Sequence, residues 1–407
     1  MRSTRPALRA AWLAAAMLMS AVAGTVALAP AQAAPAGTAP AGSPAAVSAA
    51  RAALGPALAA SGPARAAARA TRGLLYAVSA AGARTAWAVG AGGADPFGAH
   101  SPVLIMRWTG TAWRPVPVPS FRRGSALLGV TAISARDAWA VGESDADFAG
   151  DVSGRMLILH WDGRSWTRVP SPDPRGHGVL GGVAAVSARD VWAVGQTGDS
   201  QPVIIHWTGA AWHQVRAPAG ASAFMGVTAS RLGVWATSSS NAGRFLIARW
   251  NGRSWLRTPV PPGQGTLEGV TTAPARRAWA VGTTGVPPPL GTFHSVILRW
   301  NGARWSAVPS PVRTDQLIGV SSASARSGWV VGASGAYTRH VKLAILRWNG
   351  IAWSLARGPR LAGESLLVGV TARSARSAWA VGTNLRSKTA IPLILHWNGL
   401  RWAVAPS

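Results

Sequence analysis

Apolar residues in this chain occur in short runs that are separated by glycine, proline and polar residues. Residues 126–172, for example, contain the runs ALLGVTAIS, AWAVGES, MLILHW and WTRV with turn residues between them. Short apolar runs bounded by turn residues are typical of β-strands. Because the connections are short, we expect these four strands to pair antiparallel in sequence order.

The pair Asp162-Gly163 stands between the last two runs. An Asp-Gly pair in this setting favours a tight type I′ hairpin, whose two central residues need positive φ. A two-residue turn pairs Trp161 with Arg164 and Leu159 with Trp166. Since side chains alternate along a strand, this pairing predicts a buried face made of Leu157, Leu159, Trp161 and Trp166.

The same hairpin phrase occurs seven times along the chain. Its two tryptophans are always five residues apart, and a second phrase of the type AWAVG precedes each copy. Three tryptophans in each of seven copies make 21 of the 22 in the chain, so aromatic burial is a property of the repeat. The hairpin pairs are Trp108/Trp113, Trp161/Trp166, Trp207/Trp212, Trp250/Trp255, Trp300/Trp305, Trp348/Trp353 and Trp397/Trp402, and the preceding tryptophans are Trp87, Trp139, Trp192, Trp235, Trp279, Trp329 and Trp379.

A four-stranded sheet that is apolar on both faces has to bury each face against another sheet. Seven such sheets in a ring achieve this, and the spacing of 43 to 53 residues between copies agrees with one propeller blade. We therefore predict an all-β fold, a seven-bladed β-propeller of four-stranded antiparallel blades, over residues 71–407. We expect the blades at residues 71–119, 120–172, 173–218, 219–262, 263–311, 312–359 and 360–407.

A small residue occupies one position in the first strand of every blade. This pattern predicts that the first strand lies nearest the propeller axis, where side chains have least room. The first copy begins with this strand and the last copy is complete, so we expect blade one to pack on blade seven without exchanging a strand. The small residues are Ala77, Gly129, Gly182, Gly226, Gly269, Gly319 and Gly369.

The N-terminal region differs from the repeats. Residues 1–33 combine a basic start, an uncharged apolar run and the sequence Ala31-Gln32-Ala33, which is typical of a cleaved secretory signal peptide. An uncleaved membrane anchor is the alternative, and we expect no transmembrane segment after signal cleavage. Residues 34–70 are rich in Ala, Pro, Gly and Ser and are predicted to be a disordered linker. The chain has no cysteine, so burial alone has to stabilise the exported fold.

The net charge of the chain is +27, and loss of the three signal arginines leaves +24 (27 − 3). A strongly basic surface attracts polyanions. Export favours anionic cell-wall polymers, acidic glycans or anionic lipid surfaces over nucleic acid, which is not an expected partner. The alternative is that arginine richness beside alanine and glycine richness reflects codon composition.

Two basic positions recur in step with the repeat. The turn after the first strand carries an arginine in every copy, and sevenfold geometry predicts a ring of guanidinium groups for phosphate, sulfate or carboxylate groups. The alternative is that each one stacks on tryptophan or pairs across blades. These arginines are Arg84, Arg136, Arg189, Arg231, Arg276, Arg326 and Arg376. The residue before each first hairpin tryptophan is predicted to be scaffold: Arg107, His160, His206, Arg249, Arg299, Arg347 and His396.

Candidate binding residues also occur where the copies differ. Tyr76 and Glu268 replace the apolar residue before the small residue of the first strand, and a carboxylate near a channel mouth is a candidate ligand contact. A salt bridge is the simpler explanation for Glu268. Variable loops follow the second strands, and one of them is densely acidic. The acidic loop suggests a cation site, and a solvated loop is the alternative. Its acidic residues are Glu143, Asp145, Asp147 and Asp151.

The repeat pattern resembles a known family. The segments L-x-G-V-x-A, G/A-W-A-V-G and I-L-x-W-N/D-G-x-x-W, clearest in residues 317–353, are similar to seven-bladed BNR-type repeat domains. The similarity is greatest to the photosystem II stability and assembly-factor type and extends to sialidase-like propellers. It covers residues 71–407, although the Asp-Gly-Gly turn and the Ser-x-Asp of a full Asp-box are absent. It implies a propeller that acts either as a sialidase-like glycoside hydrolase or as a scaffold for another exported protein.

Sialidase-like chemistry, as the resemblance implies it, needs a tyrosine nucleophile with a glutamate partner, an aspartate and an arginine triad. The chain has only Tyr76 and Tyr337, and only Glu143, Glu268 and Glu364. We therefore predict a non-catalytic, exported binding module without a cofactor, at the cell surface or in the medium. Its predicted partner is an anionic glycan, a cell-wall polymer or a protein, and the hydrolase and the scaffold are the alternatives.

Overall fold

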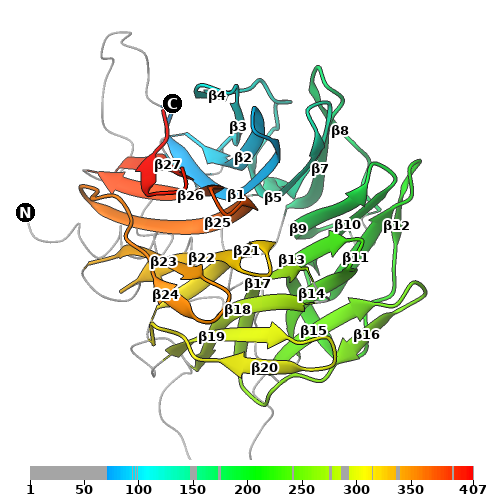
Figure 1. Cartoon of the computed structure of the whole chain (residues 1–407). Coiled ribbons are helices and arrows are strands. Elements are labelled where there is room, and N and C mark those ends of the chain that lie inside the picture. The colour runs from blue at the N-terminus through cyan, green and yellow to red at the C-terminus, as the bar shows by residue number, and fades with distance from the viewer. Residues whose placement is uncertain are drawn as a thin grey trace, which may run out of the picture.

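The chain forms seven four-stranded antiparallel sheets arranged in a ring, which confirms the predicted all-β, seven-bladed propeller (Figure 1). The computed structural model describes residues 71–407 apart from residues 94, 97, 99, 147–153, 173–175, 241–242, 275–276, 286–292, 314, 336–339, 387–388 and 407. The predicted signal peptide and linker lie outside the described residues. In the described part of the chain, no helix has the length and hydropathy that a bilayer crossing requires.

The strands of each blade follow one another from the axis outward. The inner strands are β1 (Gly73–Gly82), β5 (Gly124–Ser134), β9 (Gly178–Ser187), β13 (Ala221–Ser230), β17 (Gly265–Ala273), β21 (Gln316–Ser324) and β25 (Glu364–Ser374). The second strands are β2 (Thr85–Gly92), β6 (Asp137–Ala146), β10 (Asp190–Thr197), β14 (Gly233–Ser240), β18 (Arg277–Gly285), β22 (Ser327–Ser334) and β26 (Ser377–Arg386).

The two remaining strands of each blade form its outer half. The third strands are β3 (Val103–Trp108), β7 (Arg155–Trp161), β11 (Pro202–Trp207), β15 (Phe245–Trp250), β19 (Phe293–Trp300), β23 (Lys342–Trp348) and β27 (Thr389–Trp397). The short outermost strands are β4 (Trp113–Pro115), β8 (Trp166–Arg168), β12 (Trp212–Gln214), β16 (Trp255–Thr258), β20 (Trp305–Val308), β24 (Trp353–Leu355) and β28 (Trp402–Val404).

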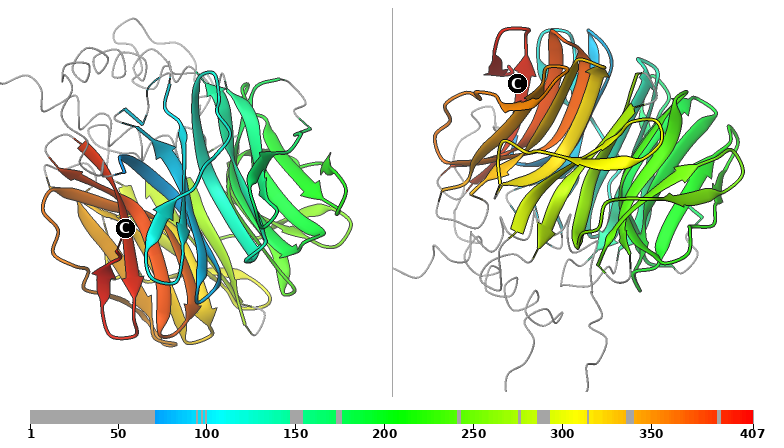
Figure 2. Two further views of the ribbon diagram at one scale, coloured as in Figure 1. Left: turned by 90° about the horizontal axis from the view of Figure 1, so that it is seen from above. Right: turned by 60° about the horizontal axis from the view of Figure 1, so that its bottom comes forward.

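The ring closes by packing of the first blade on the last. Each described sheet contains four strands that are consecutive in sequence, so no strand is exchanged between blades one and seven, as predicted. The two blades lie side by side in the views of Figures 1 and 2. The backbone amide of Trp113 donates to the carbonyl of Pro406 at 3.0 Å. A shared cluster of buried side chains from both blades completes the closure.

The inner strand of every blade has a β-bulge next to its small residue. In blade six the ladder skips Ile318, which lies between the paired residues Leu317 and Gly319. A Cβ atom on Gly319 would lie 2.6 Å from the carbonyl oxygen of Val368 in the next blade. Neighbouring backbones therefore meet around the axis, which confirms the predicted place of the small residues. The bulge residues are Tyr76, Leu128, Gly181, Met225, Glu268, Ile318 and Val368.

The hairpin between the third and fourth strands has four loop residues, not the predicted two. In blade two Trp161 pairs with Trp166 and Leu159 with Arg168, so the predicted pairings of Trp161 with Arg164 and of Leu159 with Trp166 are wrong. The carboxylate of Asp162 accepts the backbone N–H groups of Ser165 and Arg164, both at 2.8 Å. These two bonds hold the pKa of Asp162 below its usual value. The side chain thus organises a longer turn, which an Asp-Gly signal alone does not reveal.

The predicted buried face is correct in spite of this register. The observed and predicted registers differ by two residues, and a shift of two preserves the face on which each side chain lies. The same turn is formed with an asparagine side chain in four other blades, by Asn251, Asn301, Asn349 and Asn398. The predicted residues are all buried in the boundary between blades one and two: Leu157, Leu159, Trp161 and Trp166.

Three tryptophans fill each boundary between blades. The second-strand ring of one blade lies 4.7–5.0 Å from the third-strand ring of the next blade, measured between centroids. The same second-strand ring lies 4.9–5.4 Å from the fourth-strand ring of the next blade, and the planes of these two rings meet edge-on at 79–90°. Such pairs contribute about 0.5–1.5 kcal/mol beyond area burial. Going around the ring, the triads begin with Trp87/Trp161/Trp166 and end with Trp379/Trp108/Trp113.

A basic or imidazole side chain covers the second-strand tryptophan of every blade. His206 stacks on Trp192 with centroids 3.9 Å apart, and the guanidinium carbon of Arg249 lies 5.1 Å from the ring centroid of Trp235. Burial in this layer lowers the pKa of His396. The predicted scaffold role is therefore confirmed for all seven residues: Arg107, His160, His206, Arg249, Arg299, Arg347 and His396.

Candidate functional site

The recurring turn arginines lie at one end of the blades. Because consecutive strands are antiparallel, the turns after the inner strands share this end with the outer hairpins, and the variable loops after the second strands lie at the opposite end. Arg276 lies outside the described residues. The other six are exposed and are called the arginine rim: Arg84, Arg136, Arg189, Arg231, Arg326 and Arg376.

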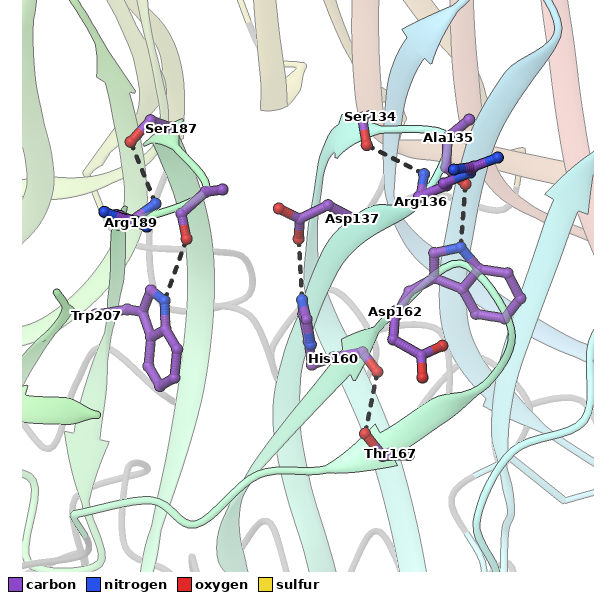
Figure 3. A network of polar contacts seen from close by, with 12 residues as sticks. Ser134, Ala135, Arg136, Asp137, His160, Asp162, Thr167, Ser187, Arg189 and Trp207 are labelled. Atoms are coloured by element: carbon purple, nitrogen blue, oxygen red, sulfur yellow. Dashed lines mark hydrogen bonds and ion pairs between the residues drawn. The ribbon is translucent and has the colours of Figure 1, made fainter. Parts of the chain in front are cut away.

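The backbone of the rim turns is held by two bonds. In blade two, Ser134 Oγ accepts the backbone N–H of Arg136 at 3.1 Å. The indole N–H of Trp161 donates to the carbonyl of Ala135, also at 3.1 Å (Figure 3). The same two bonds recur in blades three, six and seven. The Ser-Ala-Arg turn therefore presents its arginine in the same way in these four blades, whereas in blade four Ser230 Oγ accepts the N–H of Leu232, so Arg231 stands one position earlier in the turn.

In every blade of the rim except blade four, where no atom lies near Gly252, the aliphatic part of the arginine packs on the hairpin glycine of its own blade. A Cβ atom on Gly163 would lie 3.1 Å from the Cβ of Arg136, and one on Gly350 would lie 3.0 Å from the Cγ of Arg326. Gly163 has φ 99°, so glycine is required here both by the backbone and by the arginine above it. The arginine stem is thus fixed by packing while its guanidinium group faces solvent.

The rim has no acidic partner of its own. Among the described residues, no carboxylate lies within ion-pair distance of a rim guanidinium. Two aspartates near this face bind histidines instead. Asp137 binds His160 at 2.9 Å (Figure 3), and Asp190 binds His206 at 2.8 Å. Neither predicted alternative, stacking on tryptophan or pairing across blades, describes the rim. Its guanidinium groups stand exposed and uncompensated.

Tyr76 and Glu268 occupy the bulge position in blades one and five. Their exposed fractions are 3 % and 7 %, so both side chains are buried near the propeller axis. Tyr76 packs with Leu128 and Met225 in a cluster contributed by several inner strands. The binding role of Tyr76 and Glu268 stays a prediction, and their burial argues against access by a ligand.

The acidic loop that suggested a cation site is only partly described. Asp147 and Asp151 lie outside the described residues, and Glu143 is buried at 6 % exposure. Asp145 has φ 59° and lines a cleft together with basic side chains. No group of three or more His, Asp or Glu side chains within the described ranges is arranged to hold a metal. The cation site therefore stays a prediction.

This cleft, of about 470 Å³, was not predicted from the sequence. Its lining comes from the connection before β5, the end of β6, the outer strands β7 and β8, and the connection after β8. The adjacent pair Arg122 and Arg123 was its only local signal. We call it the basic cleft, and it is lined by Arg122, Arg123, Asp145, Arg155, Arg168 and His177.

Known structures show the same fold at low sequence identity. No family profile and no curated protein sequence matches the chain. The structure titled YCF48 bound to D1 peptide is 17 % identical with a TM-score of 0.51, over 77 % of this chain and 91 % of that one. In fold, this chain is similar to YCF48. The predicted resemblance to the photosystem II assembly-factor type is therefore confirmed for the fold.

Two further structures give the same result. YCF48 from Cyanidioschyzon merolae is 14 % identical with a TM-score of 0.51, over 79 % of this chain and 96 % of that one. U3-55K is 11 % identical with a TM-score of 0.50, over 77 % and 89 %. At such identities the likeness extends to the propeller and not to a shared ligand.

Proposed function

We propose that this chain is an exported, non-catalytic binding module that uses its arginine rim to hold an anionic glycan or cell-wall polymer at the cell surface. The observation that carries this proposal is the rim itself, six exposed arginines without an ion-pair partner in the described part of the chain. Guanidinium groups bind phosphate, sulfate and carboxylate in forked geometry. Their repetition around a ring suits a polymer with repeated charges.

Replacing three adjacent rim arginines by glutamine, R84Q/R136Q/R189Q, is expected to weaken retention on immobilised heparin or wall polymer about tenfold. Exposed charge contacts contribute about 0.2–1 kcal/mol each, and 1.4 kcal/mol is a factor of ten. The dependence of log K on log salt should also become shallower by about one unit for each lost contact. A salt titration on the column measures both.

The matched control is R114Q/R257Q/R357Q, which removes the same charge from exposed positions on or next to outermost strands. It should retain most of the binding. Equal losses in the two variants would mean that net charge and not the rim attracts the polymer, and no retention of the wild type at physiological ionic strength would remove the proposal.

The non-catalytic part of the proposal is supported by the burial of Tyr76, one of only two tyrosines in the chain. A buried phenol next to apolar side chains is poorly placed to attack a sugar. Release of a chromogenic sialoside or another glycoside by the purified protein would contradict it. Export is tested by measuring the mass of the protein isolated from the culture medium. The mass should correspond to a chain that begins near Ala34.

A protein partner is the second candidate. YCF48, which has a similar fold, is described in complex with D1 peptide. Here Ile351 and Leu400 occupy equivalent hairpin tips of neighbouring blades, on the rim face, and each is 87 % exposed. Exposed apolar side chains beside arginine suit a peptide better than a highly charged polymer. If I351S/L400S abolishes capture of a partner while heparin retention stays, this candidate is preferred.

A further inference from the structure

The basic cleft lies at the end of blade two that is opposite the arginine rim. Four arginines and one histidine line it, together with a single aspartate. Arg155 begins β7, Arg168 ends β8, and Arg122 and Arg123 stand in the chain that leads into β5. All four arginine side chains are exposed, so their charged ends are accessible from solvent. The cleft is thus separate from the rim in position and in the segments that build it.

The aspartate of the cleft does not neutralise these arginines. Asp145 Oδ1 accepts the backbone N–H of Arg122 at 3.3 Å, and its Oδ2 accepts the hydroxyl of the buried Ser144 at 3.3 Å. Ser144 Oγ also accepts a bond of 3.5 Å from the guanidinium of Arg168. Among the carboxylates that the structure describes, none lies within ion-pair distance of the four guanidinium groups. Asp145 therefore links the connection before β5 to β6 and holds the backbone of Arg122 beside that strand.

The net positive charge of the residues that line the cleft indicates which kind of ligand it can bind. Four arginines and one aspartate give the cleft a formal charge of +3 (4 − 1) with His177 neutral. Like charges in one cleft repel each other, and a ligand with two negative charges on one group relieves this more than a monoanion does. A phosphate monoester is close to doubly charged at neutral pH, whereas a carboxylate or a sulfate monoester carries one charge.

We propose that the basic cleft binds a phosphate monoester on a small sugar-sized group. Arginine forks match the oxygen geometry of phosphate and bind it in pairs of parallel bonds. The volume of about 470 Å³ lies within the usual range of ligand sites and exceeds the size of a bare ion. The site is independent of the proposed function of the rim, because the rim can fail to bind polymer while the cleft binds phosphate.

The test is isothermal titration of the full mature chain with glucose 6-phosphate. The wild type is expected to bind it, and R155Q/R168Q is expected to bind it about tenfold more weakly or less, since two charged contacts are lost. The matched control is K342Q/R257Q, because Lys342 and Arg257 occupy the same strand positions on blades six and four as Arg155 and Arg168 on blade two. The control and the rim variant R84Q/R136Q/R189Q should bind like the wild type.

Further probes separate phosphate from charge in general. Glucose 6-sulfate and acetate should bind at least about tenfold more weakly than glucose 6-phosphate, because each carries one charge. Inorganic phosphate should also bind more weakly, because it leaves part of the cleft unfilled. Absence of binding by the wild type, an equal loss in K342Q/R257Q, or equal affinity for glucose 6-sulfate or inorganic phosphate would overturn the proposal. Thermal melting of R155Q/R168Q verifies that the variant is folded.

Discussion

Replacing Trp379 by alanine is expected to lower the free energy of unfolding by about 3–5 kcal/mol, the range for a fully buried large aromatic side chain. Trp379 is 3 % exposed and packs against Trp108 at 4.8 Å and Trp113 at 5.2 Å, across the boundary that closes the ring. The substitution removes the centre of that triad, and the indole volume cannot be refilled because both neighbours are held in their own strands. Urea unfolding followed by circular dichroism measures the loss.

The boundary between blades seven and one should contribute as much to the free energy of unfolding as the other boundaries between blades. Trp279 holds the same position between blades five and six, so Trp279→Ala should cost a similar amount. Leu400→Ala is the control, since this side chain is 87 % exposed and its loss should change stability by no more than about 0.5 kcal/mol. A much smaller effect of Trp379→Ala than of Trp279→Ala would contradict a ring that is closed by packing alone.

Replacing Gly332 by alanine is expected to destabilise the protein by about 2–3 kcal/mol, the upper part of the range for overpacking. A Cβ atom on Gly332 would overlap the carbonyl oxygen of Gln316, because the bulge of β21 brings this backbone close to β22. The atoms that this Cβ would meet are backbone atoms of Gln316 and Leu317, so a side-chain rotation cannot relieve the clash. The shift in urea midpoint measures the effect.

Blade four supplies the matched control for this prediction. Its residue at the same position is Ser238, and there the ladder is interrupted between Ala221 and Phe224. The hydroxyl of Ser238 donates to the carbonyl of Ala223 at 2.7 Å, the place where the other blades have close backbone contact. Ser238→Gly should therefore cost only about 1 kcal/mol, the value of one hydrogen bond. A cost for Gly332→Ala no larger than that would contradict the steric argument.

Much of the scaffold could be predicted because its signals are local and repeated. Short apolar runs bounded by turn residues predict the strands, and the seven copies of the phrase with two tryptophans five residues apart predict the number of blades. The hairpin register could not be predicted from Asp162-Gly163, since a side chain accepting two backbone amides selects a longer turn than the dipeptide indicates. The error left the buried face correct because two residues is one full strand period.

The candidate sites were predicted less well than the scaffold. The arginine rim was predicted as a set, because its members recur with the repeat. That no described carboxylate pairs with the rim could not be predicted, because Asp137 and Asp190 lie next to the rim turns in sequence and yet bind His160 and His206. The basic cleft was missed, because its residues belong to several segments of one blade and to the connections on either side of it.

The amino-acid sequence alone is sufficient for the number of blades, the order of strands and the packing of 21 tryptophans between blades, of which 18 are buried and Trp108, Trp207 and Trp250 are partly buried, since each depends on spacing along the chain and on the removal of apolar surface from water. Tertiary structure decides which blade supplies each ring of a triad, which aspartates bind a histidine and which basic residues share a cleft. These contacts join side chains that are distant in sequence, and their geometry depends on how neighbouring sheets pack and on how the connections cross between them.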